Sequence, residues 1–346
     1  MSIATKADAK VKSYEIDGDF GIEALKVTER PATALGPNQV RLKMHAASLN
    51  YRDLMMVKGD YARKLPFPLI PLSDGAGEVI ETGGEVTRVK VGDRVAGTFF
   101  QKWLSGPHGP EYGKSALGGA VNGMLANQVV LHEDGMVLIP DYMTYEQAST
   151  LPCAAVTAWH ALIASGGIKP GDTVLTMGTG GVSLFALEFA KLSGARVIIT
   201  SSSDEKLERA KALGAHEVIN YKTTPDWEKK VLELTNKDGV NHVVELGGAG
   251  TLERSLKSVI VGGQISLIGV LTGGGEINPM PILMKNIRVQ GIYVGSREMF
   301  EHMLKAMTLH KSKPIIDRVF NFDQVKDALK HMESGAHFGK IVIKIS

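Results

Sequence analysis

Short apolar runs alternate with helix-like segments over residues 173–270, and this alternation constrains the fold more than any other feature. The apolar runs lie at residues 173–177, 196–200, 217–220, 242–246 and 264–270, and helix-like segments lie at 182–193, 205–213 and 227–234. Apolar strands separated by helices form a parallel sheet with both faces covered. The alternation therefore predicts an α/β domain built on a parallel sheet.

The first 150 residues follow a different rhythm. They are rich in glycine and proline and carry alternating apolar and polar runs at 40–46, 75–81 and 89–95, the last with a Gly-Asp turn inside it. Such runs are typical of half-buried strands, and the glycines between them indicate turns, so we expect a partly closed β-barrel. The last fifty residues are expected to be irregular and to close with a strand at 340–344. The parallel-sheet domain would then lie between two pieces of a β-rich domain.

Charge and cysteine content bear on the class of protein. The net charge of +2 gives no support for a nucleic acid or a membrane as partner. Cys153 is the single cysteine, so an intrachain disulfide and a four-cysteine structural zinc are both excluded. The N-terminus lacks the apolar core of a signal peptide, and no apolar run approaches the ~20 residues of a membrane span. A cytoplasmic protein is expected.

A glycine-rich loop directly follows the run at 173–177. It reads Gly178-Thr179-Gly180-Gly181-Val182-Ser183 and leads into a helix-like segment. Glycine permits the tight turn and lets the backbone approach a pyrophosphate, which the helix N-terminus then binds. We expect Gly178, Gly180, Gly181 and Val182 to bind a dinucleotide, although Ser183 replaces the third glycine of the usual fingerprint. A glycine turn without a ligand is the alternative, which the strand–loop–helix context disfavours.

The end of the second strand bears on the choice of cofactor. An NAD site usually has an acidic residue there, whereas this strand ends in Thr200-Ser201-Ser202-Ser203. Hydroxyls of Ser201 and Ser202 can bind a 2′-phosphate, Lys206 can add charge, and Tyr221 can pack near the adenine. The sequence therefore favours NADPH, with NADH possible. Alternatively, Ser202 and Glu205 form a capping box, and different serines can serve each role.

Several motifs occur together in a known order. They are Asn50-Tyr51-Arg52-Asp53, Gly59-Asp60-Tyr61, residues 73–79, residues 91–95, residues 151–159, the glycine-rich loop, and residues 338–342. Together they resemble the medium-chain dehydrogenase/reductase superfamily along nearly the whole chain. The resemblance implies a GroES-like catalytic domain at residues 1–153 and 294–346 and a Rossmann domain, with a doubly wound parallel sheet, at 154–293. It also implies a cleft between the domains and a homodimer.

The resemblance raises the question of zinc. Zinc alcohol dehydrogenases bind the catalytic ion with Cys, His and Cys, and the corresponding positions here are Asn50, Ser73 and Cys153. Neutral amide and hydroxyl groups are poor zinc ligands, so no metal site is expected. The chain thus looks like the zinc-free branches, which are quinone oxidoreductases and enoyl reductases.

Four residues are candidates for the reacting centre. By resemblance, Asn50 lies beside the nicotinamide ribose and the substrate, although it could instead bond its own backbone in a turn. Tyr61 matches a tyrosine of enoyl reductases, where a phenol donates a proton or a hydrogen bond; packing at a cleft edge is its alternative. Tyr51 and Arg52 would line the same cleft, and Arg52 could instead pair with Asp53 or Asp74.

Further cofactor contacts are implied by resemblance. Thr157 would bond the carboxamide, or serve in helix packing. Gly269 and Val294 fall in stretches that flank the nicotinamide ring, where backbone groups hold the ring. Lys340 would meet the cofactor phosphates, or be a solvated charge at a strand end.

These features lead to one principal hypothesis and two alternatives. The first is a zinc-independent, NADPH-dependent reductase that moves hydride to quinones or α,β-unsaturated carbonyls (enals and enones). The second is an NAD(P)-dependent alcohol or aldehyde dehydrogenase. The third is an NADPH-binding protein with a sensing or structural role.

Overall fold

The computed structural model describes residues 10–61 and 65–346. The chain divides into two compact units, the second of which is Thr157–Val294; the first comprises the chain up to Val156 together with Gly295–Ser346. The boundaries expected from the sequence, after residues 153 and 293, lie one to three residues earlier in the chain. Each unit has its own sheet and its own hydrophobic core.

The second unit is built on a six-stranded parallel sheet with strand order β10-β9-β8-β11-β12-β13. Its strands are β8 (Thr173–Met177), β9 (Arg196–Ser201), β10 (Glu217–Asn220), β11 (Val240–Glu245), β12 (Val259–Leu267) and β13 (Arg288–Gly291). The order reverses between β8 and β11, as in doubly wound dinucleotide-binding domains. The α/β fold with a doubly wound parallel sheet is confirmed.

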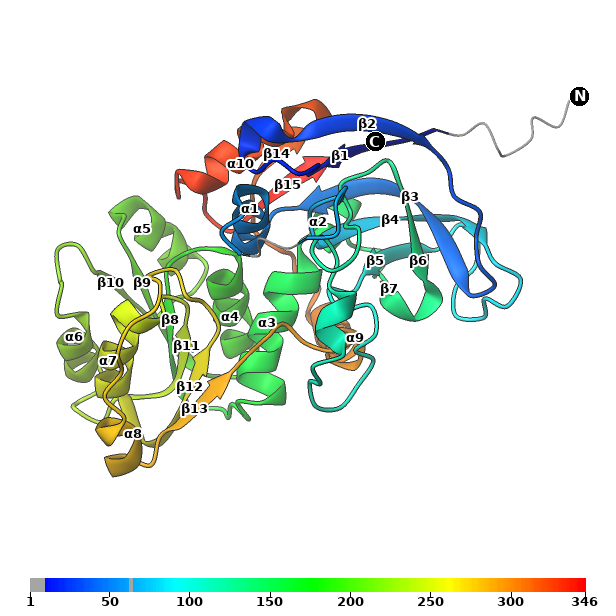
Figure 1. The fold of residues 1–346 in the computed structure, drawn as a ribbon. Coiled ribbons are helices and arrows are strands. Elements are labelled where there is room, and N and C mark those ends of the chain that lie inside the picture. Colours follow the sequence, from blue (N-terminus) through cyan, green and yellow to red (C-terminus); the bar gives the residue numbers. More distant parts are fainter. Residues whose placement is uncertain (1–9, 62–64) are drawn as a thin grey trace, which may run out of the picture. The chain divides into compact units, whose positions relative to one another are not determined.

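Helices cover both faces of this sheet (Figure 1). They are α4 (Gly181–Leu192), α5 (Asp204–Ala212), α6 (Trp227–Leu234), α7 (Ala249–Ser258) and α8 (Met280–Met284); α3 (Val156–Trp159) lies at the unit boundary between π-helical turns at Leu151–Ala155 and His160–Ala164. The central strands are apolar because they are buried on both faces: Leu175, Ile198, Val243 and Ile265 share one core with Trp227.

The first unit holds a seven-stranded sheet, in which six strands follow the order β14-β15-β3-β4-β5-β7 and the seventh, β6, pairs with β3 off this path. Its strands are β3 (Gln39–Ser48), β4 (Asp74–Thr82), β5 (Arg94–Gly97), β6 (Gln128–His132), β7 (Met136–Leu138), β14 (Ile316–Asn321) and β15 (Lys340–Lys344), and β1 (Lys10–Glu15) pairs with β2 (Lys26–Pro31). The segment at 89–95 contains a turn at residues 91–92, with Gly92 at φ 91°, in agreement with the Gly-Asp turn expected there, but only Arg94 and Val95 of the segment lie in a strand.

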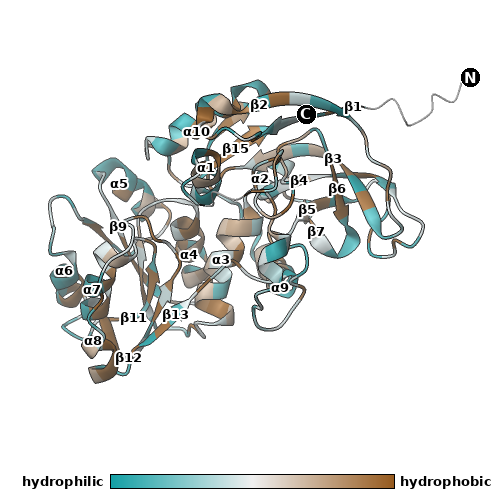
Figure 2. Ribbon diagram, viewed as in Figure 1, coloured by the Kyte–Doolittle hydropathy of each residue, from teal (hydrophilic) through white to brown (hydrophobic). Residues whose placement is uncertain are grey.

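The last fifty residues are not irregular, which corrects the expectation from sequence. They contain α9 (Arg297–His310), β14 and α10 (Val325–Glu333), while α1 (Tyr51–Lys58) and α2 (Tyr145–Ser149) come earlier in this unit. Helix α10 buries Val325, Ala328 and Leu329 in the core, and it carries both hydrophobic and hydrophilic residues in Figure 2. This amphipathic period is a helix signal that a composition-based view of the segment overlooks.

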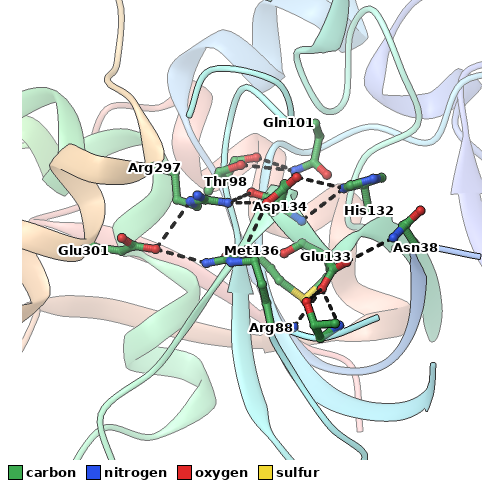
Figure 3. A network of polar contacts seen from close by, with 12 residues as sticks. Asn38, Arg88, Thr98, Gln101, His132, Glu133, Asp134, Met136, Arg297 and Glu301 are labelled. Atoms are coloured by element: carbon green, nitrogen blue, oxygen red, sulfur yellow. Dashed lines mark hydrogen bonds and ion pairs between the residues drawn. The ribbon is translucent and has the colours of Figure 1, made fainter. Parts of the chain in front are cut away.

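A polar network joins α9 to the loops of the sheet (Figure 3). Arg297 donates to Asp134 at 2.7 Å, and Arg88 donates to Glu301 at 3.1 Å. Glu133 accepts from the backbone N–H groups of residues 87 and 88 at 2.8 and 2.7 Å. These bonds anchor the chain where it re-enters the first unit.

No helix in the described part of the chain is long and apolar enough to cross a membrane.

Candidate active site and nucleotide-binding edge

Asn50 stands at the start of α1, where local hydrogen bonds fix its backbone. Its N–H donates to Oδ2 of Asp53 at 2.9 Å, and Asp53 is fully buried in the first turn of the helix. An acidic group there accepts from an otherwise unpaired N–H, and its negative charge is stabilised by the positive N-terminal end of the helix dipole. The helix ends at Gly59, whose φ of 76° is the left-handed conformation that glycine adopts readily.

The side chain of Asn50 lies between a buried cation and a buried hydroxyl. Nζ of Lys340 donates to Oδ1 of Asn50 at 2.5 Å and to the carbonyl of Leu49 at 2.6 Å. Nδ2 of Asn50 donates to Oγ of Ser73 at 3.3 Å. The alternative, a local bond of Asn50 to nearby backbone, is present beside this contact, because Asn50 and Asp53 form a capping box in which the Asn50 side chain accepts from the N–H of Asp53.

A buried carboxylate completes the group. Ser73 donates to Oδ1 of Asp74 at 2.7 Å, and the N–H of Cys153 donates to Oδ2 at 3.1 Å. Nζ of Lys340 is 4.0 Å from Oδ2 of Asp74. Burial raises the pKa of Asp74, and the Lys340 ammonium opposes that rise. We call Asn50, Ser73, Asp74 and Lys340 the Asn50 cluster.

The donor set around the Asn50 cluster does not fit a zinc ion. The amide oxygen of Asn50 accepts from an ammonium, and the hydroxyl of Ser73 is bonded to a carboxylate. Burial, followed by the charge of Asp74, raises the pKa of the Cys153 thiol, so the thiolate that zinc requires is disfavoured. Within residues 10–61 and 65–346, no group of three or more His, Cys, Asp or Glu is arranged to hold a metal.

The burial of Lys340 contradicts the alternative of a solvated charge at a strand end and speaks against the expected contact with the cofactor phosphates. The side chain is only 3% exposed, and its ammonium points into the Asn50 cluster of its own unit. Lys340 begins β15, where it and the next three residues of the strand are all buried. A lysine that binds phosphate needs an accessible ammonium.

The guanidinium of Arg52 is engaged in contacts within the first unit. It donates to the carbonyl of Leu117 at 2.8 Å, contacts Asp53 at 3.2 Å and lies 4.9 Å from the ring centre of Phe99. The ring of Tyr61, beyond the far end of α1, lies 5.8 Å from the same guanidinium. Arg52 is therefore paired with Asp53, one of the two acids considered, and it ties the loop at 117 to α1.

The two tyrosines near α1 differ from Arg52 in exposure. Tyr51 is 48% exposed and Tyr61 is 44% exposed. Tyr51 is the first residue of the helix, next to Asn50, and Tyr61 follows the C-terminal end. Tyr51 and Asn50 are therefore neighbours, whereas Tyr61 is linked to this end of the helix through Arg52.

The glycine-rich loop in the second unit suits a pyrophosphate. Gly178 has φ 73°, and a Cβ added at Gly178 or Gly180 would meet no atom within 4 Å. The open space over both glycines is where a phosphate group has to approach the backbone. Gly180 begins α4 without a side-chain cap, so the N–H groups of Gly181 and Val182 lack that partner and can bind an anion.

Ser183 occupies the position of the third glycine of the fingerprint without disturbing the packing of the helix on the strand. Its side chain is fully buried, and Oγ donates to the carbonyl of Met177 at 2.5 Å. The small side chain therefore fits between the end of β8 and the first turn of α4. Close packing of helix and strand, which the third glycine usually permits, is retained.

The serines after β9 divide into different roles. Ser203, not Ser202, caps α5, because its Oγ accepts from the N–H of Lys206 at 3.4 Å. The expected capping box of Ser202 and Glu205 is therefore wrong by one residue. Ser201 is buried at the strand end, and Ser202 is half-buried beside it. This frees Ser202 for a ligand.

Charged and aromatic groups surround the same strand ends. Tyr221 follows β10, is 42% exposed, and donates its N–H to the carbonyl of Ser201 at 3.0 Å. Lys206 is half-buried in the first turn of α5. Asp204 brings a carboxylate close to this edge, which the sequence did not predict at the strand tip, but Asn220 donates to it at 2.7 Å.

Three further cofactor candidates lie in the second unit. Thr157 is buried, at 3% exposure, next to the π-helical turns. Gly269 follows β12, and a Cβ there would collide with the carbonyl of Leu246. Val294 has φ 55°, which is rare for a β-branched residue, and its carbonyl lies 2.7 Å from Nδ1 of His160. Such backbone outliers occur most often at functional positions.

Sequence reasoning missed two buried groups that shape these sites. The ammonium of Lys340 was assigned to phosphates, and Glu245 at the end of β11 was overlooked. Glu245 is fully buried, and its carboxylate accepts from Gly247, Gly248 and Thr251 at 2.8, 3.1 and 2.6 Å and also from Ser255. A carboxylate directly before Gly247-Gly248 at a strand end is the signal that could have revealed it.

Comparison with known proteins identifies the family. Residues 36–141 match the alcohol dehydrogenase GroES-like domain, and residues 181–308 match the zinc-binding dehydrogenase domain. A zinc-type alcohol dehydrogenase-like protein of Schizosaccharomyces pombe is 44% identical over 94% of this chain and 96% of its own. A homologue of quinone oxidoreductase-like protein 2 from Nematostella vectensis is 31% identical over 89% of this chain and 82% of its own.

A solved structure agrees in fold along the whole length. That of an NAD-dependent alcohol dehydrogenase has a TM-score of 0.88 and 32% identity, covering 97% of this chain and 100% of its own. Both the sequence relatives and this structure span both units. The chain therefore belongs to the medium-chain dehydrogenase/reductase superfamily and is an oxidoreductase of that family.

Proposed function

We propose that this protein is a zinc-independent, NADPH-dependent reductase of quinones or α,β-unsaturated carbonyl compounds. The observation that carries the proposal is the Asn50 cluster, where an amide, a hydroxyl and a buried ammonium stand at the positions expected for zinc ligands and their surroundings. Of these groups the amide of Asn50 would donate a hydrogen bond to a developing oxyanion, and none of them supplies a Lewis acid.

This donor chemistry favours conjugate reduction. In a conjugate reduction the nicotinamide, when bound, supplies one hydride to the β-carbon and is oxidised, and the substrate gains that hydride and one proton. Charge spreads from the carbon onto the carbonyl oxygen, so moderate hydrogen-bond donors suffice to stabilise it. A simple ketone or aldehyde concentrates charge on one oxygen and gains more from a metal.

The residues of the first unit divide the remaining roles. We assign to Nδ2 of Asn50 a hydrogen bond to the substrate oxygen, and to the phenol of Tyr61 or to water the proton. Tyr51 is exposed beside Asn50 and would contact the substrate. Arg52 would act indirectly, because its guanidinium is engaged with Asp53 and Leu117.

Nucleotide binding is assigned to the carboxyl edge of the parallel sheet in the second unit. Gly178, Gly180, Gly181 and Val182 would bind the pyrophosphate. Ser201, Ser202 and Lys206 would bind the 2′-phosphate, with Tyr221 near the adenine. Thr157, Gly269 and Val294 would hold the nicotinamide. Half-buried Ser202 and Lys206 support NADPH over NADH.

An alcohol or aldehyde dehydrogenase is the second candidate function. The names of the Schizosaccharomyces pombe relative and of the solved NAD-dependent structure favour it. The chemistry of the Asn50 cluster favours the reductase, because alcohol oxidation in zinc-type enzymes relies on the metal. By resemblance we also propose a homodimer, which sedimentation at twice the chain mass of 37.2 kDa would test, and from the single cysteine and the N-terminal sequence we propose a cytoplasmic location.

The test is NADPH oxidation at neutral pH with a chelator present, against an ortho-quinone, an enal and a simple aldehyde. Turnover of the quinone or enal, with the aldehyde slow, is the expected result. Chelator-sensitive turnover of an alcohol would instead support the metal-dependent dehydrogenase. Tight NADPH binding without any turnover in a broad panel would support a sensing or structural role.

A further inference from the structure

We propose that Lys340 is a positioning residue that orients and polarises the side-chain amide of Asn50, so that Nδ2 becomes the donor to the substrate oxygen. The proposal deepens the proposed function and rests on it. Lys340 itself touches neither substrate nor cofactor in this account. It acts through the 2.5 Å hydrogen bond to Oδ1 of Asn50.

Hydrogen-bond direction fixes the orientation of the amide. An ammonium has donors only, so the atom that faces Lys340 must be the amide oxygen. Ser73 has one hydroxyl hydrogen, which it gives to the carboxylate of Asp74, and so it accepts from Nδ2 of Asn50. The three bonds therefore all point from the ammonium toward the carboxylate.

The amide of Asn50 has one hydrogen beyond the one that Ser73 accepts. Nδ2 carries two hydrogens, and Ser73 takes one of them. The other interacts with the carboxylate of Asp74, whose pKa a hydrogen bond from Asn50 helps to lower, so a substrate oxygen would compete with that carboxylate for this hydrogen. Asn50 is 9% exposed, so the amide is nearly dry but reachable by a small polar atom.

Charge makes this amide a better donor than an ordinary asparagine. Hydrogen bonds to ionised groups are roughly twice as strong as neutral ones, and each bond in a chain strengthens its neighbour by about 10–30%. The ammonium pulls electron density toward Oδ1 and leaves the Nδ2 hydrogens more positive. Low exposure of Lys340 and Asp74 limits screening by water.

The distances favour this role over a simple ion pair. Nζ of Lys340 lies 4.0 Å from Asp74 but 2.5 Å from Asn50. Asp74 already accepts from Ser73 and from the N–H of Cys153. The ammonium therefore balances the charge of Asp74 at longer range while its direct bonds go to Asn50 and Leu49.

The experiment combines kinetics with an observation of the amide itself. The variants are Lys340→Met, Asn50→Ala and both together, with Lys344→Met as the matched control at the exposed end of the same strand. Lys340→Met combined with Asp74→Asn removes both charges and covers the case in which the single variant fails to fold. Folding is checked by thermal unfolding, and NADPH affinity by nucleotide fluorescence.

Kinetics should show loss of transition-state stabilisation. We expect Lys340→Met to lower kcat by a factor on the order of 10², as for loss of an oxyanion donor, with NADPH affinity within about twofold of wild type. In the Asn50→Ala background, adding Lys340→Met should lower kcat by a further factor of less than about three, because the two residues act as one unit. A folded Lys340→Met protein with wild-type kcat would overturn the proposal, as would additive losses.

The second readout does not depend on turnover. In protein labelled with [15N]asparagine, Asn50→Asp identifies the side-chain resonance of Asn50, and we expect its amide protons to move upfield in Lys340→Met but not in Lys344→Met. An unchanged resonance would overturn the proposal. Failure of wild type to reduce any quinone or enone would overturn the proposed function instead, while the resonance still judges the contact between Lys340 and Asn50.

Discussion

Oε1 of Glu245 accepts the backbone N–H of Gly247 at 2.8 Å, so the last residue of β11 holds the glycine turn that follows it. The same oxygen accepts from Gly248 and Thr251. Backbone bonds extend the connection, because Thr272 donates to the carbonyl of Gly247 at 2.8 Å and Gly269 donates to the carbonyl of Glu245 at 3.2 Å. One buried carboxylate thus organises two loops at the carboxyl edge of the sheet.

Glu245→Gln should therefore weaken both stability and nucleotide binding. The charge-assisted bonds become neutral ones, and we expect a loss of about 1–3 kcal/mol in the free energy of unfolding, measured in urea. NADPH affinity should fall several-fold because the loops loosen. Glu253→Gln on the exposed face of α7 is the matched control and should change neither quantity. Unchanged stability in Glu245→Gln would contradict this account of the turn.

Gly180→Ala tests the phosphate loop without disturbing the fold. Gly180 has φ −80°, which alanine adopts, and a Cβ there meets no protein atom within 4 Å. The methyl group would occupy space assigned to the pyrophosphate, so NADPH affinity should fall at least about tenfold, or ~1.4 kcal/mol, with the melting temperature unchanged. Gly84→Ala, also in open space, is the control. Wild-type NADPH affinity in Gly180→Ala would show that the pyrophosphate does not bind at this loop.

Ser202→Asp tests the choice of cofactor. A carboxylate beside the assigned 2′-phosphate site repels that phosphate and accepts from a 2′-hydroxyl instead. We expect NADPH affinity to fall at least about tenfold, one decade in Kd, while NADH affinity holds or rises, as measured by titrating nucleotide fluorescence. Thr223→Asp, on the exposed turn after β10, controls for added charge. An equal effect on both nucleotides would place the 2′-phosphate elsewhere.

Cys153 should react slowly with alkylating agents. Burial and the nearby charge of Asp74 raise the pKa of its thiol, and the thiolate is the reactive form. At pH 8 an unperturbed thiol, with a pKa near 8.5, is about one quarter ionised. We expect iodoacetamide to modify native protein at least about tenfold more slowly than urea-unfolded protein, a tenfold loss of thiolate being one pKa unit. Equal rates, followed by mass spectrometry on this single cysteine, would contradict the assigned environment.

The parallel-sheet unit could be predicted closely because its strands are apolar on both faces. The runs at 173–177 and 217–220 coincide with β8 and β10, and the segment at 227–234 coincides with α6. The C-terminal helices α9 and α10 were missed, because helices with short apolar stripes in a polar segment give a weak local signal. The Gly-Asp turn expected inside the segment at 89–95 is present, but the strand begins only after it, at Arg94.

Candidate site residues could be predicted from the sequence only where they lie in one short motif whose local structure fixes their positions. The loop from Gly178 to Ser183 did so, because a strand and a helix fix its ends. Lys340 did not, because its partner Asn50 lies 290 residues away in the chain and only the pairing of β15 with β3 brings them together. Ser203 was missed as the helix cap because a one-residue shift separates two equally plausible serine caps.

The most direct measurement of the central claim follows where the hydride goes. Wild-type protein in chelator is given an enone and NADPH carrying deuterium at the transferable position of C4, and the product is examined by NMR and mass spectrometry. We expect a saturated ketone with one deuterium at the β-carbon. Deuterium at the carbonyl carbon of an allylic alcohol, or product that forms only when zinc is restored, would contradict the central claim.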